Sequence, residues 1–333
     1  MKIGIVGGTG NISTSIVKLL LKQGHEVVCF NRGRRELPPD GARLIRGDRK
    51  DRAAFEAAMR KEKFDAAIDM ICFNAEDAES SVRAFRDVGC FVMCSTVCTY
   101  GVDYDYLPVT EDHPLRAFTP YGKNKVAADN VFMREYYNSG FPAVIIKPSS
   151  TYGPIMGMLR QIVWDFSWID RIRKGKPIIV SGDGLTVHQF MHVDDAAKAF
   201  AGILRRPDCV GQTYNLAYPQ YVRWDDFHAT AMKVLGREVE TVCVPMQTLA
   251  TYEIPNYGIL PDEFAYNCYY CMRKLTRDLP DFAATISLEQ GMAQVIAAMD
   301  KAGMIPDSDA SIWEDEIIAA QKSAWKGNKP VRD

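Results

Sequence analysis

The chain has 333 residues, of which 47% are hydrophobic and 25% charged, a composition typical of an ordinary globular protein. Its formal net charge of −2 gives no general electrostatic attraction to nucleic acid or to an anionic membrane. No run reaches the ~18 apolar residues of a membrane span, and the first segment, MKIGIVGGTG, lacks the apolar region and cleavage site of a secretory signal, so we expect a cytoplasmic protein.

Short β-rich runs alternate with helical spacing through the first 150 residues. KIGIVG predicts a strand, NISTSIVKLLLKQG a helix that ends at Gly24, and HEVVCFN a second strand, which together form a βαβ unit. Further strands are predicted at 42–48, 64–71, 90–96 and 142–150, and further helices at 51–63, at 77–89 and from Pro120. This alternation implies an α/β fold with a parallel, doubly wound sheet of Rossmann type.

The pattern changes after Pro154. A Trp-rich segment and helical stretches separated by prolines follow, whereas HVDDAAKAFAGIL and QTYNLA look like a helix and a strand that return to the first layer. We therefore predict a large domain at 1–155, joined by 188–217. A smaller, partly interleaved lobe is predicted from 156–187 and 218–333, and we expect it to bind the substrate.

A glycine-rich loop, GGTGNIS at residues 7–13, connects the first strand to the first helix. Gly7 and Gly10 allow a tight turn and a close approach of the backbone to a pyrophosphate, which the amino terminus of the helix then stabilises. This strand–turn–helix context favours dinucleotide binding by the large domain over a purely structural turn.

Nine cysteines, an odd number scattered over the chain, indicate reduced thiols rather than a disulfide framework. Cys268 and Cys271 form a lone C-x-x-C. A zinc site would require a second close pair, and no His lies near these cysteines in the sequence, so we expect no metal site.

The segment TPYGKNKVAADNVF places Tyr121 and Lys125 four residues apart, just after a proline that is suited to the first turn of a helix. Residues at this spacing lie on one helix face, so the phenol and the ammonium become neighbours. The spacing alone is equally compatible with a solvated helix surface.

Several segments together resemble the extended, atypical short-chain dehydrogenase/reductase superfamily, in its NAD-dependent epimerase/dehydratase branch. GGTGNIS corresponds to the family's G-x-x-G-x-x-G, STVCTYG to its strand end with Ser/Thr and Tyr-Gly, and YGKNK to its Y-x-x-x-K. KPSSTYGP and FMHVDDAAKAF match later motifs in the same order, and the resemblance covers about residues 1–235.

The resemblance implies that Tyr121 is the general acid/base, that Lys125 lowers its pKa and holds the nicotinamide ribose, and that Thr96 hydrogen-bonds the substrate oxygen. A free phenol titrates near pH ~10, so it needs a neighbouring cation to act as a base at neutral pH. The implied cofactor-binding residues are Gly7, Thr9, Gly10, Asn11, Ile12, Asn31, Arg32, Asp48, Arg49, Lys125, Pro148 and Ser149.

Some positions depart from the family pattern. Ser13 replaces the third glycine of the loop, and Val97 and Cys98 stand where family dehydratases carry Asp-Glu, which argues against a sugar-nucleotide 4,6-dehydratase. His188 and Gln189 replace the Arg-Asp whose arginine binds the diphosphate of a nucleotide sugar, and this argues against an ordinary nucleotide-sugar substrate.

The end of the second strand reads FNRGRR. NAD-binding relatives carry an acid at this point, whereas Asn31 cannot repel a 2′-phosphate, and Arg32, Arg34 and Arg35 offer guanidinium groups to pair with one. The resemblance places Asp48 at the adenine, with Arg49 beside it. We therefore expect NADP or NAD, with NADP slightly favoured over NAD.

The sequence thus predicts an NAD(P)-dependent epimerase or oxidoreductase that acts on a sugar or sugar derivative. A simple carbonyl reductase or dehydrogenase remains an alternative. Another is an RNA-binding role, because GDRKD, FNRG and TVHQFMHVDD also resemble an atypical branch that includes chloroplast stem-loop-binding proteins. Retention of Tyr121, Lys125 and Thr96 argues against a pure RNA-binding module.

Relatives form a two-fold contact between the helix that carries Y-x-x-x-K and the preceding crossover helix. In this chain those helices are 121–138 and 77–88, and we expect a homodimer built from them. The apolar residues available for the contact are Val126, Phe132, Met133, Val82 and Phe85.

Overall fold

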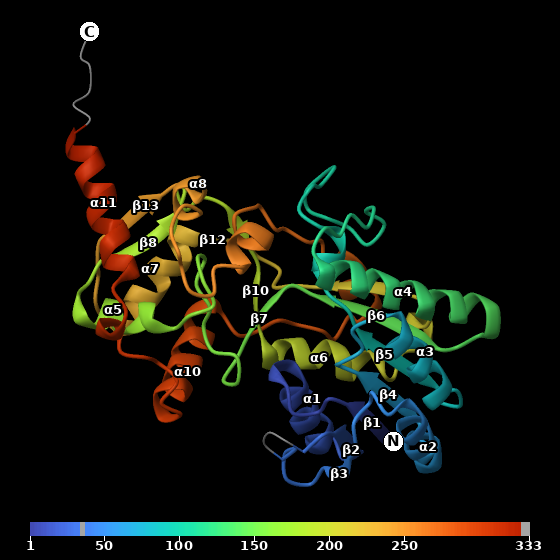
Figure 1. Ribbon diagram of the computed structural model, residues 1–333. Helices are drawn as coiled ribbons and strands as arrows, with labels where there is room; N and C mark the ends of the chain where they lie inside the picture. The colour runs from blue at the N-terminus through green and yellow to red at the C-terminus, as the bar shows by residue number, and fades with distance from the viewer. Residues whose placement is uncertain (34–36, 328–333) are drawn as a thin grey trace. The chain divides into compact units, whose positions relative to one another are not determined.

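A computed structural model describes residues 1–33 and 37–327. The chain divides into two compact units (Figure 1). Unit 1 comprises residues 1–155, 189–219 and 269–285, and unit 2 comprises residues 156–188, 220–268 and the remainder from 286.

Unit 1 is built on a seven-stranded sheet in the order β11-β6-β5-β4-β1-β2-β3, in which every neighbouring pair is parallel. This confirms the predicted α/β, doubly wound class. The buried strands are almost continuously apolar, as expected where helices cover both faces of a parallel sheet. The strands are β1 Lys2–Val6, β2 Glu26–Asn31, β3 Arg43–Arg46, β4 Ala66–Asp69, β5 Cys90–Cys94, β6 Ala143–Pro148 and β11 Thr213–Leu216.

The helices of unit 1 fall into two packed groups, in one of which α1 packs against α6, and in the other α2 against α3 and α3 against α4. A short parallel pair, β7 with β10, adjoins α6. The bounds are α1 Asn11–Lys22, α2 Arg52–Glu62, α3 Ala75–Ala84, α4 Pro120–Ser139, α6 Val193–Ile203, α9 Arg273–Asp278, β7 Ser150–Tyr152, β10 Phe190–His192 and the 3₁₀ turns η1 Val97–Tyr100 and η2 Pro207–Cys209.

One hydrophobic core of unit 1 is a chain of phenylalanine rings between the sheet and the helices α2, α3 and α4. The ring centroids of Phe85 and Phe91 lie 5.5 Å apart, and those of Phe91 and Phe132 lie 5.0 Å apart. This core also takes up part of the apolar surface that we expected at a two-fold contact. Val82, Phe85 and Phe132 are buried within the chain itself, because α3 and α4 pack on each other.

Unit 2 contains two small sheets and several helices. β8 pairs with β13 in parallel, β9 pairs with β12 in antiparallel fashion, and α7 packs against α5 and α10. The elements are α5 Ser167–Lys174, β8 Ile178–Ser181, β9 Val187–His188, β12 Val222–Arg223, α7 Trp224–Leu235, β13 Thr241–Val244, α8 Met246–Leu249, the π-helical turn η3 Leu260–Phe264, α10 Leu288–Lys301, η4 Ser308–Ala310 and α11 Trp313–Gly327.

Residues 269–285 differ from the sequence-based division, which assigned 218–333 as a whole to the second lobe. They belong to unit 1, because α9 packs against the outer strand β11. Nothing in the local sequence marks this return. No helix in the described part of the chain combines the length and the apolar character that a bilayer crossing requires.

Candidate active site

The glycine-rich loop adopts the tight turn that its sequence predicts. Gly7 has φ +84°, a conformation that favours glycine, and a Cβ on Gly8 would lie 2.4 Å from the Sγ of Cys29. At the position of the missing third glycine, the buried Ser13 accepts a hydrogen bond from the N–H of Gly10 at 2.7 Å. Ser13 therefore closes the turn at the start of α1 rather than disturbing it.

Asn31, the last residue of β2, bonds to this loop. Its Nδ2 donates to the Oγ1 of Thr9 at 2.7 Å, and its Oδ1 accepts from the N–H of Gly8 at 2.9 Å. The amide of Asn31 thus holds the glycine-rich loop in place. The next residue, Arg32, is exposed, and within the described residues it has no ion-pair partner. Arg34 and Arg35 lie outside the described residues.

A cleft of about 710 Å³ opens beside the loop at the carboxyl edge of the sheet. Of the predicted cofactor-binding residues, those that line it are Gly7, Thr9, Gly10, Asn31, Arg32, Asp48 and Arg49. Lining residues that the sequence analysis missed are Phe30, Gly33, Gly47, Lys50, Arg52, Ile71, Phe73, Asn74 and Asp77. Asn11 and Ile12 lie in the first turn of α1, half-buried, and Pro148 ends β6.

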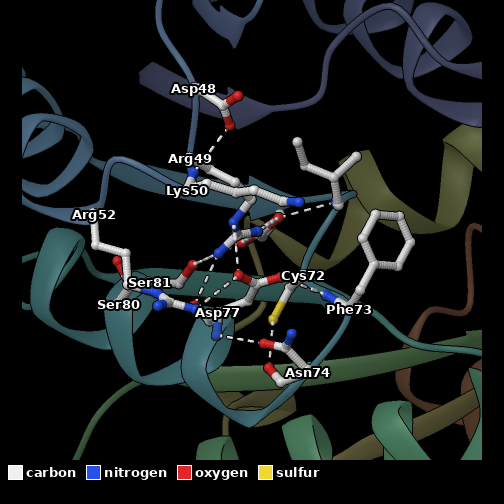
Figure 2. Close-up of polar contacts among 12 residues, drawn as sticks. Asp48, Arg49, Lys50, Arg52, Cys72, Phe73, Asn74, Asp77, Ser80 and Ser81 are labelled. Atoms are coloured by element: carbon white, nitrogen blue, oxygen red, sulfur yellow. Dashed lines mark hydrogen bonds and ion pairs between the residues drawn. The ribbon is translucent and has the colours of Figure 1, made fainter.

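Arg49, which we expected beside the adenine, forms several contacts within the protein (Figure 2). It is buried, and its Nη1 donates to both carboxylate oxygens of Asp69, at 3.0 and 2.9 Å. Its Nη2 donates to the carbonyl of Asp77 at 2.8 Å and to the Oγ of Ser81 at 3.0 Å. Burial opposes the charge, but the carboxylates of Asp69 and Asp77 raise the pKa of Arg49 above its ordinary value.

The guanidinium of Arg49 therefore joins β4 to α3, and the same residue also lines the cleft. Asp48 remains half-exposed in the cleft, where its Oδ1 accepts from the backbone N–H of Lys50 at 3.0 Å. The carboxylate of Asp48 is therefore available to a ligand in the cleft.

Tyr121 and Lys125 lie in the first turns of α4. The helix starts where the Oγ1 of Thr119 accepts from the N–H of Gly122 at 3.1 Å. Tyr121 is 45% exposed, whereas Lys125 is 2% exposed, and the Lys125 Nζ lies 5.8 Å from the centroid of the Tyr121 ring. The structure thus brings the phenol and the ammonium together on one helix face.

Two backbone carbonyls hold the ammonium of Lys125. The Nζ donates to the carbonyls of Cys72 and Cys94, both at 2.8 Å, and so sits where β4 and β5 end. An ammonium has three N–H donors, so one is left for a further partner. The centroid of the Phe73 ring lies 4.9 Å from the same Nζ, on the side of the cleft that Phe73 lines.

Thr96 lies two residues beyond β5. It is 7% exposed, and its Oγ1 accepts from the N–H of Cys98 at 3.2 Å, which caps η1. The neighbouring Tyr100 is not a second candidate acid/base, because it is fully buried and its hydroxyl donates to the Oδ1 of Asn215 at 2.8 Å. Burial raises the pKa of Tyr100 above its ordinary value.

A buried ion pair beneath this region was missed from the sequence. Lys147 and Asp129 pair at short range, and the Lys147 Nζ also donates to the Oγ1 of Thr99 at 2.8 Å. Asp129 in turn accepts from the Oγ of Ser95 at 2.9 Å. The network thereby fixes the segments on both sides of Thr96. A lysine inside the apolar strand AVIIKP is the sequence signal that could have revealed it.

The positions that replace the diphosphate-binding Arg-Asp are engaged in other contacts. The Oε1 of Gln189 accepts from the N–H of Tyr270 at 2.7 Å, and its Nε2 donates to the carbonyl of Tyr218 at 2.6 Å. Its own carbonyl accepts from the Oγ of Ser149 at 3.2 Å. Gln189 is a brace within unit 1, and His188 is a buried residue of unit 2.

The chain is similar to a known family of proteins. A family model described as the NAD dependent epimerase/dehydratase family matches residues 3–217. The 2'-dehydrokanamycin reductase of Streptomyces kanamyceticus is 28% identical over 251 residues, which cover 75% of this chain and 71% of that protein. The chloroplast stem-loop binding protein of 41 kDa b of Arabidopsis thaliana is 27% identical over 250 residues, which cover 71% of this chain and 63% of that protein.

A solved structure shares the fold over most of the chain. UDP-glucose-4-epimerase from Stenotrophomonas maltophila, with bound NAD and formylated UDP-arabinopyranose, matches with a TM-score of 0.74 and 18% identity over 91% of this chain and 99% of that one. At this identity the likeness concerns the fold.

Proposed function

Since the chain belongs to the NAD dependent epimerase/dehydratase family, a family of enzymes, we propose that it oxidises or reduces a secondary alcohol or ketone of a carbohydrate derivative. Tyr121 acts as the acid/base for the hydroxyl proton, Lys125 stabilises the phenolate, and Thr96 orients the reacting oxygen. Net reduction or dehydrogenation is the preferred reaction, and epimerisation at the same carbon is the alternative.

One observation carries this proposal: the exposed Tyr121 lies beside the buried ammonium of Lys125 at the carboxyl edge of the sheet. A cation next to a phenol favours the phenolate, the form that accepts the proton. Two carbonyls fix the Lys125 ammonium, so it can act without a cost of reorganisation at the moment of proton transfer.

The cleft of unit 1 fits a dinucleotide. A side chain on Gly8 would collide with Cys29, so glycine lets this turn pack closely on β2, and the N-terminus of α1 begins at the same turn, where a helix favours a phosphate. The nicotinamide, when bound, accepts or supplies the hydride. The third N–H of Lys125 is suited to a ribose hydroxyl, and Asp48 to the adenosine end.

NADP is the preferred cofactor in this proposal. The amide of Asn31 is neutral and is used by the loop, so no carboxylate at the end of β2 repels a 2′-phosphate. Arg32 and Lys50 line the same cleft, and a guanidinium pairs with phosphate in a charge-assisted, bidentate manner.

A carbohydrate derivative without a nucleotide is the preferred substrate class. Gln189 and the buried His188 offer no guanidinium to a diphosphate. The similarity to 2'-dehydrokanamycin reductase, which is 28% identical to this chain, supports the same substrate class.

The test is Tyr121→Phe, with Tyr137→Phe as the matched control, because Tyr137 lies on the same helix and is 76% exposed. NADPH consumption is measured with a panel of keto-sugars and keto-aminoglycosides. We expect Tyr121→Phe to lower kcat by at least about a hundredfold with unchanged NADPH affinity, and the control to keep its activity. Retention of more than about a tenth of the activity would refute the role of Tyr121.

Epimerisation gives a different result in the same assay. An epimerase returns the hydride to its own substrate, so it shows no net NADPH consumption and retains cofactor through purification. Cofactor absorbance in the purified protein, together with inversion of the substrate carbon without NADPH consumption, would show that the enzyme is an epimerase and not a reductase.

The similarity to the stem-loop binding protein favours RNA binding as a second candidate function. Arg32, Arg46 and Lys50 are exposed at one end of the sheet and would supply phosphate contacts. Filter binding of a stem-loop RNA across a salt series decides the matter: RNA affinity above that for either cofactor at physiological salt would favour this function.

A further inference from the structure

Three potential metal ligands from distant parts of the sequence meet in unit 2. His188, Glu263 and Cys268 each offer one ligand atom, an imidazole nitrogen, a carboxylate oxygen and a thiol sulfur, and these atoms all lie within 4.8 Å of one another. The lone C-x-x-C gave no such indication, because His188 is 80 residues from Cys268 in the sequence.

Backbone contacts fix how these residues meet. The N–H of Val187 donates to the Oδ1 of Asn267 at 3.0 Å, and the N–H of Cys268 donates to the carbonyl of Val187 at 2.8 Å. The 267–268 segment therefore follows β9 and places Cys268 beside His188. Glu263 comes from η3, a π-helical turn, and π-helical geometry is frequent at functional sites.

The surroundings suit a bound ion. His188 and Cys268 are each 1% exposed, and the His188 ring packs against Phe264 and Trp224 at centroid distances of 4.9 and 5.3 Å. Packing of this kind fixes the orientation of the imidazole ring, as a metal-bound histidine requires.

The spacing is compatible with zinc. In an equilateral triangle of side 4.8 Å, the centre lies about 2.8 Å from each corner (4.8/√3), which is the least compact case. Zinc binds sulfur at about 2.3 Å and nitrogen or oxygen at about 2.0–2.2 Å, so the three ligand atoms would each move inward by about 0.5–0.8 Å on binding. A thiolate and a carboxylate would neutralise the charge of a divalent ion.

We propose that His188, Glu263 and Cys268 form a binding site for a divalent zinc-like ion, independent of the hydride-transfer site. Nitrogen, sulfur and oxygen ligands together suit Zn²⁺ better than Mg²⁺ or Ca²⁺, which prefer oxygen alone. The ion joins β9, η3 and the 267–268 segment and so stabilises unit 2. Glu263 is half-buried and so reaches solvent, and the proposal assigns the fourth position to water.

The experiment measures zinc in the purified full chain by mass spectrometry, followed by zinc titration against a competing chelator. The variants are Cys268→Ser and Glu263→Gln. The matched control is Cys271→Ser, which removes the other thiol of the C-x-x-C, a thiol that accepts from the Nε of Arg273 at 3.4 Å. Cobalt titration adds a direct reading of thiolate ligation through its charge-transfer absorption.

We expect one zinc per chain and a zinc-dependent rise in Tm for the wild type and for Cys271→Ser. Zinc binding and the rise in Tm should be lost in Cys268→Ser and in Glu263→Gln. The cobalt–thiolate band should vanish in Cys268→Ser and persist in Cys271→Ser. If Cys268→Ser does not fold, Glu263→Gln and the control decide. Absence of zinc binding by the wild type, or binding that survives Glu263→Gln or is lost in Cys271→Ser, would overturn the proposal.

Discussion

The buried pair of Lys147 and Asp129 allows a sharp test, in which Lys147→Met removes the charge and keeps the length of the side chain. The two side chains are 2% and 5% exposed, so the substitution leaves a carboxylate out of water, and among the described residues the hydroxyl of Ser95 is the donor that remains to it. Removal of one partner of such a pair costs about 3–5 kcal/mol. Since a domain of ordinary stability has about 5–15 kcal/mol in all, the variant should be markedly destabilised.

The double variant Lys147→Met/Asp129→Asn supplies the control. Its neutral amide still accepts from Ser95 and carries no buried charge, so we expect it to recover at least about half of the lost stability. Urea unfolding followed by far-ultraviolet circular dichroism measures both variants, and the midpoint should shift while the slope stays constant.

The single variant Lys147→Met should also lower the turnover rate. The Oγ1 of Thr99 accepts from Lys147 and donates to the carbonyl of Thr96 at 2.8 Å, so the loss of the ammonium loosens the segment that carries Thr96. We expect kcat of the folded variant to fall about tenfold with unchanged cofactor affinity. A stability loss below about 1 kcal/mol, or a double variant no more stable than the single one, would show that the pair is solvated and our reasoning wrong.

Three other predictions concern the cofactor, acid stability and assembly. Arg32→Ala should weaken NADP binding about tenfold and leave NAD binding unchanged in calorimetric titration, whereas equal or tighter NAD binding by the wild type would contradict the NADP preference. Burial lowers the pKa of His228 in the folded protein to about 3. Between pH ~6.5 and ~3 the unfolded chain therefore binds a proton at this histidine that the folded chain does not bind. The contribution of His228 to the free energy of unfolding is complete above this pH range and is lost as the pH falls through it. From pH 7 to 5 this histidine should cost about 2 kcal/mol, and His228→Phe should abolish that part of the pH dependence measured by urea unfolding. We further predict a homodimer in light scattering at micromolar concentration, dissociated by Val126→Glu on α4; a monomeric wild type would rule this out.

The sequence by itself determined the features that local patterns encode. Alternation of strands and helices predicted the doubly wound sheet, because period and length specify each element before it packs. The glycines at 7 and 10 predicted the turn that the structure has, and the spacing of Tyr121 and Lys125 predicted their common face, since helix geometry sets both.

Only the tertiary structure decided which polar groups form hydrogen bonds or ion pairs inside the protein. Arg49 pairs with Asp69, and Asn31 bonds to the glycine-rich loop, contacts that both residues make while they also line the cleft. The meeting of His188 with Cys268 depends in the same way on the pairing of distant segments. A buried charge or amide must find a partner, but that partner lies 20 to 80 residues away in these three cases, where no local pattern identifies it.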